Sequence, residues 1–171
     1  MRTDDKRKRP GMHTYYNNIL ILLVLNISME LTFIDYLKTE LKNLDDTGAD
    51  FDRNLMHFPN IVELLCDLLD EDVVDQESRL MINAALGYLL VPNDVVPEDV
   101  YGAYGYMDDM YISCVVLINL KKKYSELMTK LWNSKDDLYD ALDSCFSAGD
   151  LFLTEKNLKE KVLRYCGLSG D

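Results

Sequence analysis

Two stretches decide the fold of this chain: residues 88–97, Tyr-Leu-Leu-Val-Pro-Asn-Asp-Val-Val-Pro, and residues 105–109, Gly-Tyr-Met-Asp-Asp. Prolines, a glycine and carboxylates cluster there between two strongly apolar segments. Proline fixes its own φ and glycine accepts a positive φ, so such a cluster demands a specific chain path. The two stretches therefore predict a sharp connection between two helices.

Hydrophobic periodicity predicts helices in the rest of the chain. Apolar residues recur every three or four positions, and no stretch alternates as a strand would. We expect Asn60 and Asp75 to cap helices, Pro92 to end one, and Gly167 to follow the last. The expected helices span residues 31–44, 60–70, 76–90, 108–132, 136–147 and 154–166.

These patterns indicate an all-α protein. We expect a compact bundle of about five or six helices, with a central helical hairpin joined by the Pro/Asp/Gly-containing loop. The helix over residues 76–90 is apolar on most sides after Arg79, so it is expected to be a central, buried element.

Composition narrows the function classes. A chain of 171 residues is one domain of ordinary size, and its net charge of −12 disfavours binding to nucleic acid and to anionic lipid.

The cysteines lie far apart, without the paired spacing of a zinc site, and three of them fall on apolar helix faces. A reducing, cytoplasmic location fits this pattern. The four cysteines are Cys66, Cys114, Cys145 and Cys166.

The N-terminal segment, residues 1–28, differs from the helical domain expected over residues 29–171. It carries five Lys or Arg and two Asp, a balance of +3, which leaves −15 for the remainder. Residues 12–29 contain no Asp, Glu, Lys or Arg, and Ile19–Leu25 is wholly apolar. Three interpretations stay open: a membrane anchor or targeting segment, a buried first helix, or a true start at Met29.

The spacing of prolines and carboxylates resembles the signature of the YkvA-like family, over about residues 81–120. The chain departs from it in having Val91 where serine is frequent, and in a connection one residue longer. The resemblance implies a small helical domain with no established biochemical activity, and some relatives are treated as membrane-associated. The matching positions are Pro92, Asp94, Pro97, Gly105, Asp108 and Asp109.

The residues at these six positions have a structural interpretation. Pro92 and Pro97 would stiffen the connection, and Gly105 can take a positive φ. Asp108 and Asp109 would lie in the first turn of the next helix, where the helix dipole and unpaired N–H groups stabilise carboxylates. Asp94 would close a turn onto backbone donors in the connection.

A second hypothesis makes the carboxylates a cation site. Asp94, Asp108 and Asp109, joined by Glu98 or Asp99, would supply oxygen ligands for Ca²⁺ or Mg²⁺. Their spacing matches no EF-hand loop. We expect no other cofactor.

No catalytic motif is present, so no catalytic residue is assigned. Tyr101, Tyr104, Tyr106 and Tyr111 are expected to cover the core rather than to form an interface, and residues 121–123, three lysines, to form a solvated helix face. The prediction is a noncatalytic binding or scaffold protein with a protein partner. The alternatives are a membrane-associated protein tethered by residues 12–29 and a divalent-cation-binding protein or metal-dependent enzyme.

Overall fold

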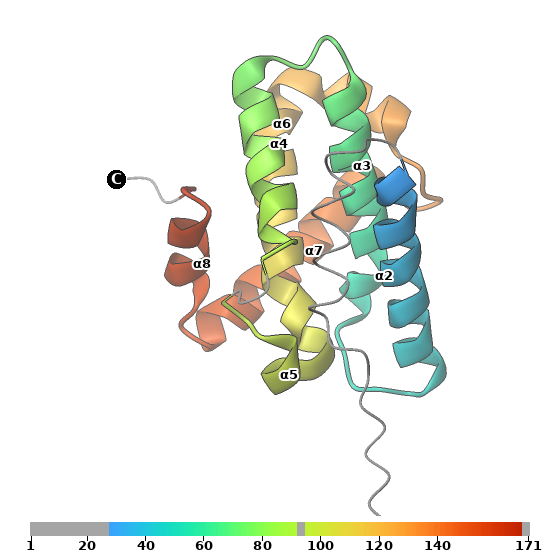
Figure 1. Ribbon diagram of the computed structural model, residues 1–171, viewed down its shortest axis with the longest axis vertical. Coiled ribbons are helices and arrows are strands. Elements are labelled where there is room, and N and C mark those ends of the chain that lie inside the picture. Colours follow the sequence, from blue (N-terminus) through green and yellow to red (C-terminus); the bar gives the residue numbers. More distant parts are fainter. Residues whose placement is uncertain (1–27, 92–94, 169–171) are drawn as a thin grey trace, which may run out of the picture.

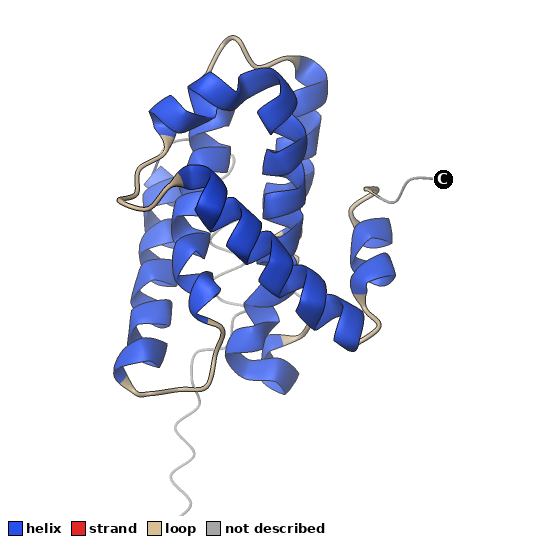
Figure 2. Cartoon of the chain, turned by 180° about the vertical axis from the view of Figure 1, so that it is seen from behind, coloured by secondary structure: helices blue, strands red, loops and turns tan. Residues whose placement is uncertain are grey.

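The computed structural model describes residues 28–91 and 95–168, and within these ranges the secondary structure is helical, which confirms the all-α prediction (Figure 2). Six helices longer than one turn form a compact bundle there, together with the single turn α5 and two 3₁₀ helices. The elements are α2 (Ser28–Asp46), η1 (Arg53–His57), α3 (Phe58–Asp70), α4 (Gln76–Tyr88), α5 (Glu98–Tyr101), η2 (Gly102–Tyr106), α6 (Met107–Leu131), α7 (Leu138–Glu155) and α8 (Lys159–Tyr165).

Helix α6 is the central element of the bundle. It packs against α3, α4, α7 and α8, while α2 lies alongside α3 at the edge (Figure 1). Viewed from behind, α7 crosses the bundle obliquely (Figure 2). Helices α4 and α6 are the two arms of the predicted hairpin, and the connection between them passes through α5 and η2.

Helix α4 is less buried than its composition predicted. Its buried face consists of Ser78, Ile82, Ala85 and Tyr88, whereas Leu80 is 63% exposed. The prediction of a central helix was wrong for α4, because α6 occupies that position and leaves α4 only one face to bury.

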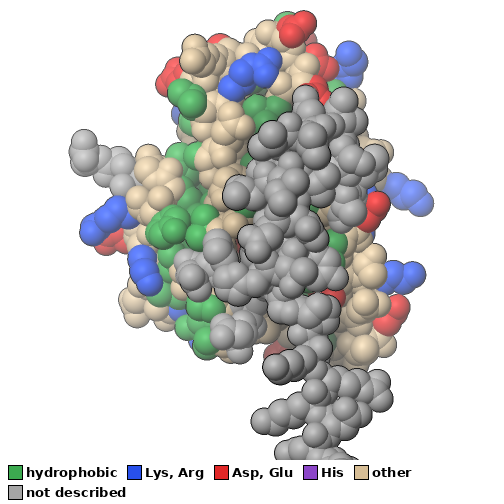
Figure 3. Space-filling view, in the orientation of Figure 1, with side chains coloured by type: hydrophobic (Ala, Val, Ile, Leu, Met, Phe, Trp, Pro, Cys, Tyr) green, Lys and Arg blue, Asp and Glu red, His purple; other side chains and the backbone are tan. Residues whose placement is uncertain are grey.

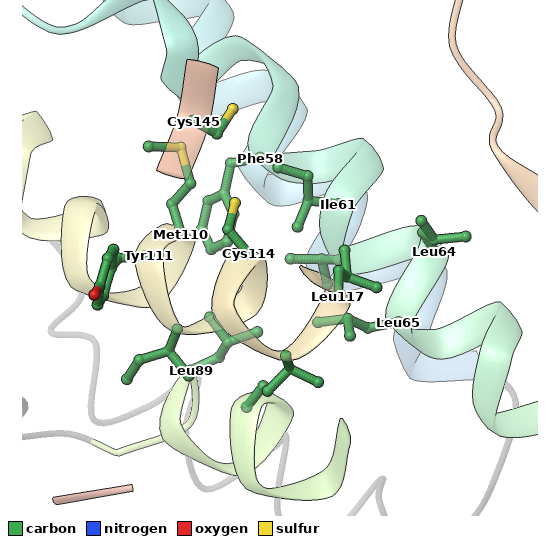
Figure 4. Close-up of a cluster of buried hydrophobic side chains, with 14 of the residues drawn as sticks. Phe58, Ile61, Leu64, Leu65, Leu89, Met110, Tyr111, Cys114, Leu117 and Cys145 are labelled. Atoms are coloured by element: carbon green, nitrogen blue, oxygen red, sulfur yellow. The ribbon is translucent and has the colours of Figure 1, made fainter. Parts of the chain in front are cut away.

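The apolar core contains the cysteines that were expected on helix faces. Cys114 of α6 and Cys145 of α7 are fully buried among side chains from α3 and α6 (Figure 4). The Cys145 thiol donates to the carbonyl oxygen of Asn54 at 3.3 Å. Burial, and then the neighbouring Cys145, raise the pKa of the Cys114 thiol. All four cysteines are free thiols, and these two act as small apolar side chains.

Helix α3 starts two residues earlier than predicted. It begins at Phe58, directly after η1, so Asn60 lies inside the first turn and is not the N-cap. Because η1 leads into α3 without a break, no capping side chain is needed. Pro59 in the first turn has a fixed φ that suits a helix start.

The turn between α3 and α4 is held by two side chains. Asp75 caps α4 as predicted, since its Oδ1 accepts from the Ser78 N–H at 2.8 Å. Arg79 was not singled out from the sequence. Its guanidinium donates to the carbonyl oxygens of Val74 (2.9 Å), Glu71 (2.6 Å) and Leu69. Leu69 lies in the last turn of α3, Glu71 is its C-cap and Val74 lies in the turn, so Arg79 connects the start of α4 to the end of α3.

The last two helices have different bounds from those predicted. Helix α7 continues to Glu155 and α8 starts only at Lys159, with Asn157 between them at φ +57°. The break predicted after residue 147 is absent, and Gly149 lies inside α7, where it serves packing. A Cβ at Gly149 would lie 2.9 Å from Tyr111 Cβ, so glycine lets α7 approach α6 closely.

In the described part of the chain, no helix combines the length and apolarity that crossing a membrane requires. The predictions on the N-terminal segment fall on residues 1–27, which lie outside the described residues.

Candidate functional site

A buried polar cluster joins the end of α4, the connection and the start of α6. The Tyr88 hydroxyl donates to Asp108 Oδ2 at 2.6 Å, and the Val96 N–H donates to the same oxygen at 3.2 Å. The Val95 N–H donates in turn to the Tyr88 hydroxyl oxygen at 3.2 Å. Asp108 is fully buried and Tyr88 is 3% exposed. One carboxylate oxygen therefore fastens three segments of the hairpin.

The chemistry of this cluster favours a fixed geometry. Hydrogen bonds to a charged group contribute about 1.5–3 kcal/mol, more than bonds between neutral groups. Burial, and then the charge of Asp108, raise the pKa of Tyr88 far above its usual range. The phenol therefore stays protonated and keeps donating to the carboxylate.

Asp109 lies beside Asp108 in the first turn of α6, where both carboxylates were predicted. It is 6% exposed. Burial, and then the charges of Asp109 and Asp108, raise the pKa of the Cys166 thiol to about 12. Because the thiolate is the nucleophile, Cys166 is a poor one at neutral pH.

The other predicted hinge residues have varied positions. Pro97 is half-buried, and its carbonyl accepts from the N–H groups of Val100 and Tyr101. Gly105 is buried in η2 and does not adopt the positive φ that a glycine can take, whereas Gly102 adopts φ +60°. Gly102 lies at the boundary between α5 and η2, and it is the glycine of the connection that takes the left-handed conformation. Pro92 and Asp94 lie outside the described residues.

The predicted cation site remains a prediction. No group of three or more His, Cys, Asp or Glu side chains that could hold a metal ion occurs among the residues whose side chains the structure describes. Asp94 and the side chains of Glu98 and Asp99 lie outside that description. Asp108 and Asp109 would thus need oxygen ligands from those positions.

The four tyrosines of the connection and the start of α6 divide into two pairs. Tyr106 and Tyr111 are buried, as expected of residues that cover the core. Tyr101 and Tyr104 are half-buried and pack on Phe152 of α7, with ring centroids 6.1 and 5.5 Å apart. These contacts fasten α5 and η2 to α7.

Two of the three lysines on α6 also have defined partners. Lys123 Nζ lies 3.1 Å from Asp75 Oδ2, and Lys121 Nζ lies 3.8 Å from the centroid of the Tyr139 ring. Tyr124 has non-helical backbone angles, and its hydroxyl donates to Asp75 Oδ2 at 2.9 Å. All three lysines are exposed, as predicted, and Lys121 and Lys123 also connect α6 to its neighbours.

Tyr88 is the member of the cluster that sequence reasoning missed. The sequence did contain a signal for Tyr88: its hydroxyl is a single polar group near the apolar end of the helix expected over residues 76–90, shortly before Pro92 and Pro97. A buried tyrosine needs a hydrogen-bond partner, and the nearby carboxylates offered one.

Comparison with known proteins agrees with the resemblance found in the sequence. A family model described as "Protein of unknown function (DUF1232)" matches residues 78–113, which cover most of α4, the connection and the first turns of α6. The YkvA-like resemblance is confirmed: the chain carries a DUF1232 region, and the buried Tyr88–Asp108 cluster lies within it.

Three similar proteins extend this comparison. "Uncharacterized protein ORF9" of Methanothermobacter thermautotrophicus is 29% identical over 128 residues, which are 74% of this chain and 86% of that protein. The E3 ubiquitin-protein ligase RNF170 of Xenopus tropicalis is 37% identical over 51 residues, or 20% of its length. The Xenopus laevis ligase is 35% identical over the same length. No solved structure matches the chain.

Proposed function

We propose that this chain is a noncatalytic binding or scaffold protein with a protein partner. One observation carries the proposal: Asp108, the best candidate for chemistry, is fully buried and accepts hydrogen bonds from Tyr88 and Val96. A carboxylate used in this way holds backbone in place and does not face a substrate. The DUF1232 region would then supply a rigid helical hairpin.

Thermal melts of the full chain with Ca²⁺, Mg²⁺, Mn²⁺, Zn²⁺ or chelator test this proposal. An ion that binds only the folded state raises the melting temperature, so millimolar ion would reveal even a weak site. We expect no shift with any ion. We also expect Asp108→Asn to lower the melting temperature equally with ion and with chelator.

The contrary result is a shift that Asp94→Asn or Asp108→Asn abolishes. It would assign Asp94, Asp108 and Asp109 to a Ca²⁺ or Mg²⁺ site and reopen the question of a metal-dependent enzyme. Lys122→Ala, a change at an exposed α6 position away from the carboxylates, is the matched control.

A second candidate function is membrane association through residues 12–29. Its support is the run without charged side chains, preceded by the basic cluster. Fractionation of cells that express the chain with and without residues 1–28 tests it. Membrane association that is lost on truncation would support tethering, and equal behaviour of both forms would count against it.

A further inference from the structure

An acidic and apolar surface lies where α3 gives way to α4. We define the α3–α4 surface by Asp70, Asp72, Val73, Glu77 and Leu80. Val73 is 68% and Leu80 63% exposed, although both are large apolar side chains. Glu77 and Leu80 are three residues apart on α4, so they share one face of the helix. Acidic and apolar side chains, with Lys or Arg side chains among them, lie close together at this end of the molecule (top of Figure 3).

Negative charge is crowded beside this surface. Burial, and then the charges of Glu63, Asp70 and Glu71, raise the pKa of Asp67. Within the described residues, Lys123 is the cation bound to Asp75 and Glu77, and Arg79 is engaged with carbonyl oxygens. A ligand with positive charge and apolar side chains would complement the surface.

The start of α2, to which the N-terminal segment is joined, lies toward this end of the bundle. Helices α2 and α3 are antiparallel neighbours joined by residues 47–57, so α2 starts toward the end at which α3 finishes (Figure 1). Ile19–Leu25 precedes the start of α2 at Ser28 by a few residues. At about 3.5 Å per extended residue, these side chains can reach the α3–α4 surface.

The chemistry of that segment matches the surface. Ile19–Leu25 is wholly apolar, and residues 6–9 read Lys-Arg-Lys-Arg. Residues 1–28 carry +3 against −15 for the remainder of the chain. The N-terminal segment therefore contains both the basic and the apolar side chains that would complement the α3–α4 surface.

We propose that the N-terminal segment docks on the α3–α4 surface of its own chain. Ile19–Leu25 would cover Val73 and Leu80, and the basic residues 6–9 would lie near Asp70, Asp72 and Glu77. The segment then covers an apolar face of the domain, a role that excludes membrane insertion in the docked state. Release of the segment would expose both apolar surfaces at once.

Limited chymotrypsin digestion of the full chain tests the proposal. The enzyme cleaves after Tyr15, Tyr16 and the leucines of the segment, and intact mass follows the cuts. If the protease can cut the segment only after it has left the α3–α4 surface, the cleavage rate reports the population of the undocked state. The double variant Val73→Asp, Leu80→Asp should be cut within residues 15–25 about tenfold faster than the native chain, for a docking equilibrium of about ten.

Two further variants sharpen the test. Leu151→Asp changes a side chain that is equally exposed, at 62%, but lies on α7, and should leave the rate unchanged. Replacing residues 6–9 with glutamate should speed cleavage, and the native chain should be cut faster at high salt, because salt screens the attraction. Circular dichroism spectra that match the native one establish that each variant is folded.

Three results would overturn the proposal. The first is equal cleavage of the native chain, the double variant and Leu151→Asp. The second is protection that grows with protein concentration, because a second copy would then supply the segment. The third is a native chain cut as fast as the double variant in buffer and protected only by phosphatidylglycerol vesicles, because a membrane would then be the occupant.

Discussion

At the scale of single residues, Tyr88 and Asp108 decide how the hairpin closes. They are twenty residues apart in the chain, yet the hydroxyl and the carboxylate are 2.6 Å apart. Because both side chains are buried, water cannot replace either partner when the other is removed. The connection is held by the same pair, through the N–H groups of Val95 and Val96.

Removal of the Tyr88 hydroxyl tests this closure. Tyr88→Phe keeps the ring but deprives Asp108 of a donor and Val95 of an acceptor, so the free energy of unfolding should fall by about 1.5–3 kcal/mol. Urea denaturation measures the change. Tyr165→Phe is the matched control, because its ring packs on Tyr88 at 5.6 Å and its side chain is 55% exposed. An equal loss in both variants would contradict the assigned role.

Asp75 predicts a pH dependence of stability. The Ser78 N–H, and then Lys123 and Tyr124, hold the pKa of the Asp75 carboxyl well below its usual range. A pKa that is lower in the folded state stabilises the fold above the unfolded value of about 3.9, and this stabilisation is lost as the pH falls below it.

The stability difference between the native chain and Asp75→Asn should therefore be largest at neutral pH and shrink as the pH falls below about 4. Urea denaturation at a series of pH values measures it. A difference that stays constant from pH 7 to pH 3 would show that the charge of Asp75 is not what stabilises the cap.

At the scale of helices, close approach between α6 and α7 depends on a missing side chain. Tyr111 of α6 stacks on Phe146 of α7, with ring centroids 5.3 Å apart. One turn further along α7, Gly149 faces Tyr111 and the carbonyl oxygen of Met107. An added methyl group would have to push the two helices apart.

Two glycine substitutions separate packing from helix propensity. Gly149→Ala should lower the free energy of unfolding by about 1–3 kcal/mol, because the new Cβ overlaps Tyr111. Gly87→Ala, in α4, meets nothing within 4 Å and should raise it by up to about 1 kcal/mol, the gain in helix propensity. Thermal or urea denaturation measures both. A stabilised Gly149→Ala variant would contradict the packing argument.

At the scale of the whole molecule, the DUF1232 region depends on helices outside it. Tyr106 packs on Phe58 of α3, and Tyr104 stacks on Phe152 of α7. Residues 78–113 contain neither of those helices. The region therefore lies at the centre of a larger apolar core, and α3 and α7 pack against it.

A peptide of residues 78–113 should consequently not fold alone. A chain below about 40 residues buries too little apolar surface to offset the loss of conformational entropy. We expect the peptide to show no cooperative thermal transition by circular dichroism, whereas the full chain melts cooperatively. A sharp transition in the isolated peptide would mean that its core is self-sufficient.

Local features of the sequence predicted most of the secondary structure. Leu37 and Leu41 of α2 are four residues apart, and both point into the apolar core. Asp75 caps α4 by accepting a hydrogen bond from the N–H of Ser78, three residues away. Patterns of this kind involve residues within one helical turn of each other, so they can be recognised in the sequence without knowledge of the tertiary structure. The predicted break after residue 147 was wrong, because α7 continues to Glu155.

Only the tertiary structure decided which groups meet. The sequence placed Asp108 at a helix start, but the partnership with Tyr88 and Val96 exists because α4 and α6 fold side by side. Arg79 reaches three carbonyl oxygens because the turn after α3 brings the start of α4 back toward the end of α3. Helix formation follows from contacts between near neighbours in the chain, whereas buried polar pairs depend on the packing of distant segments.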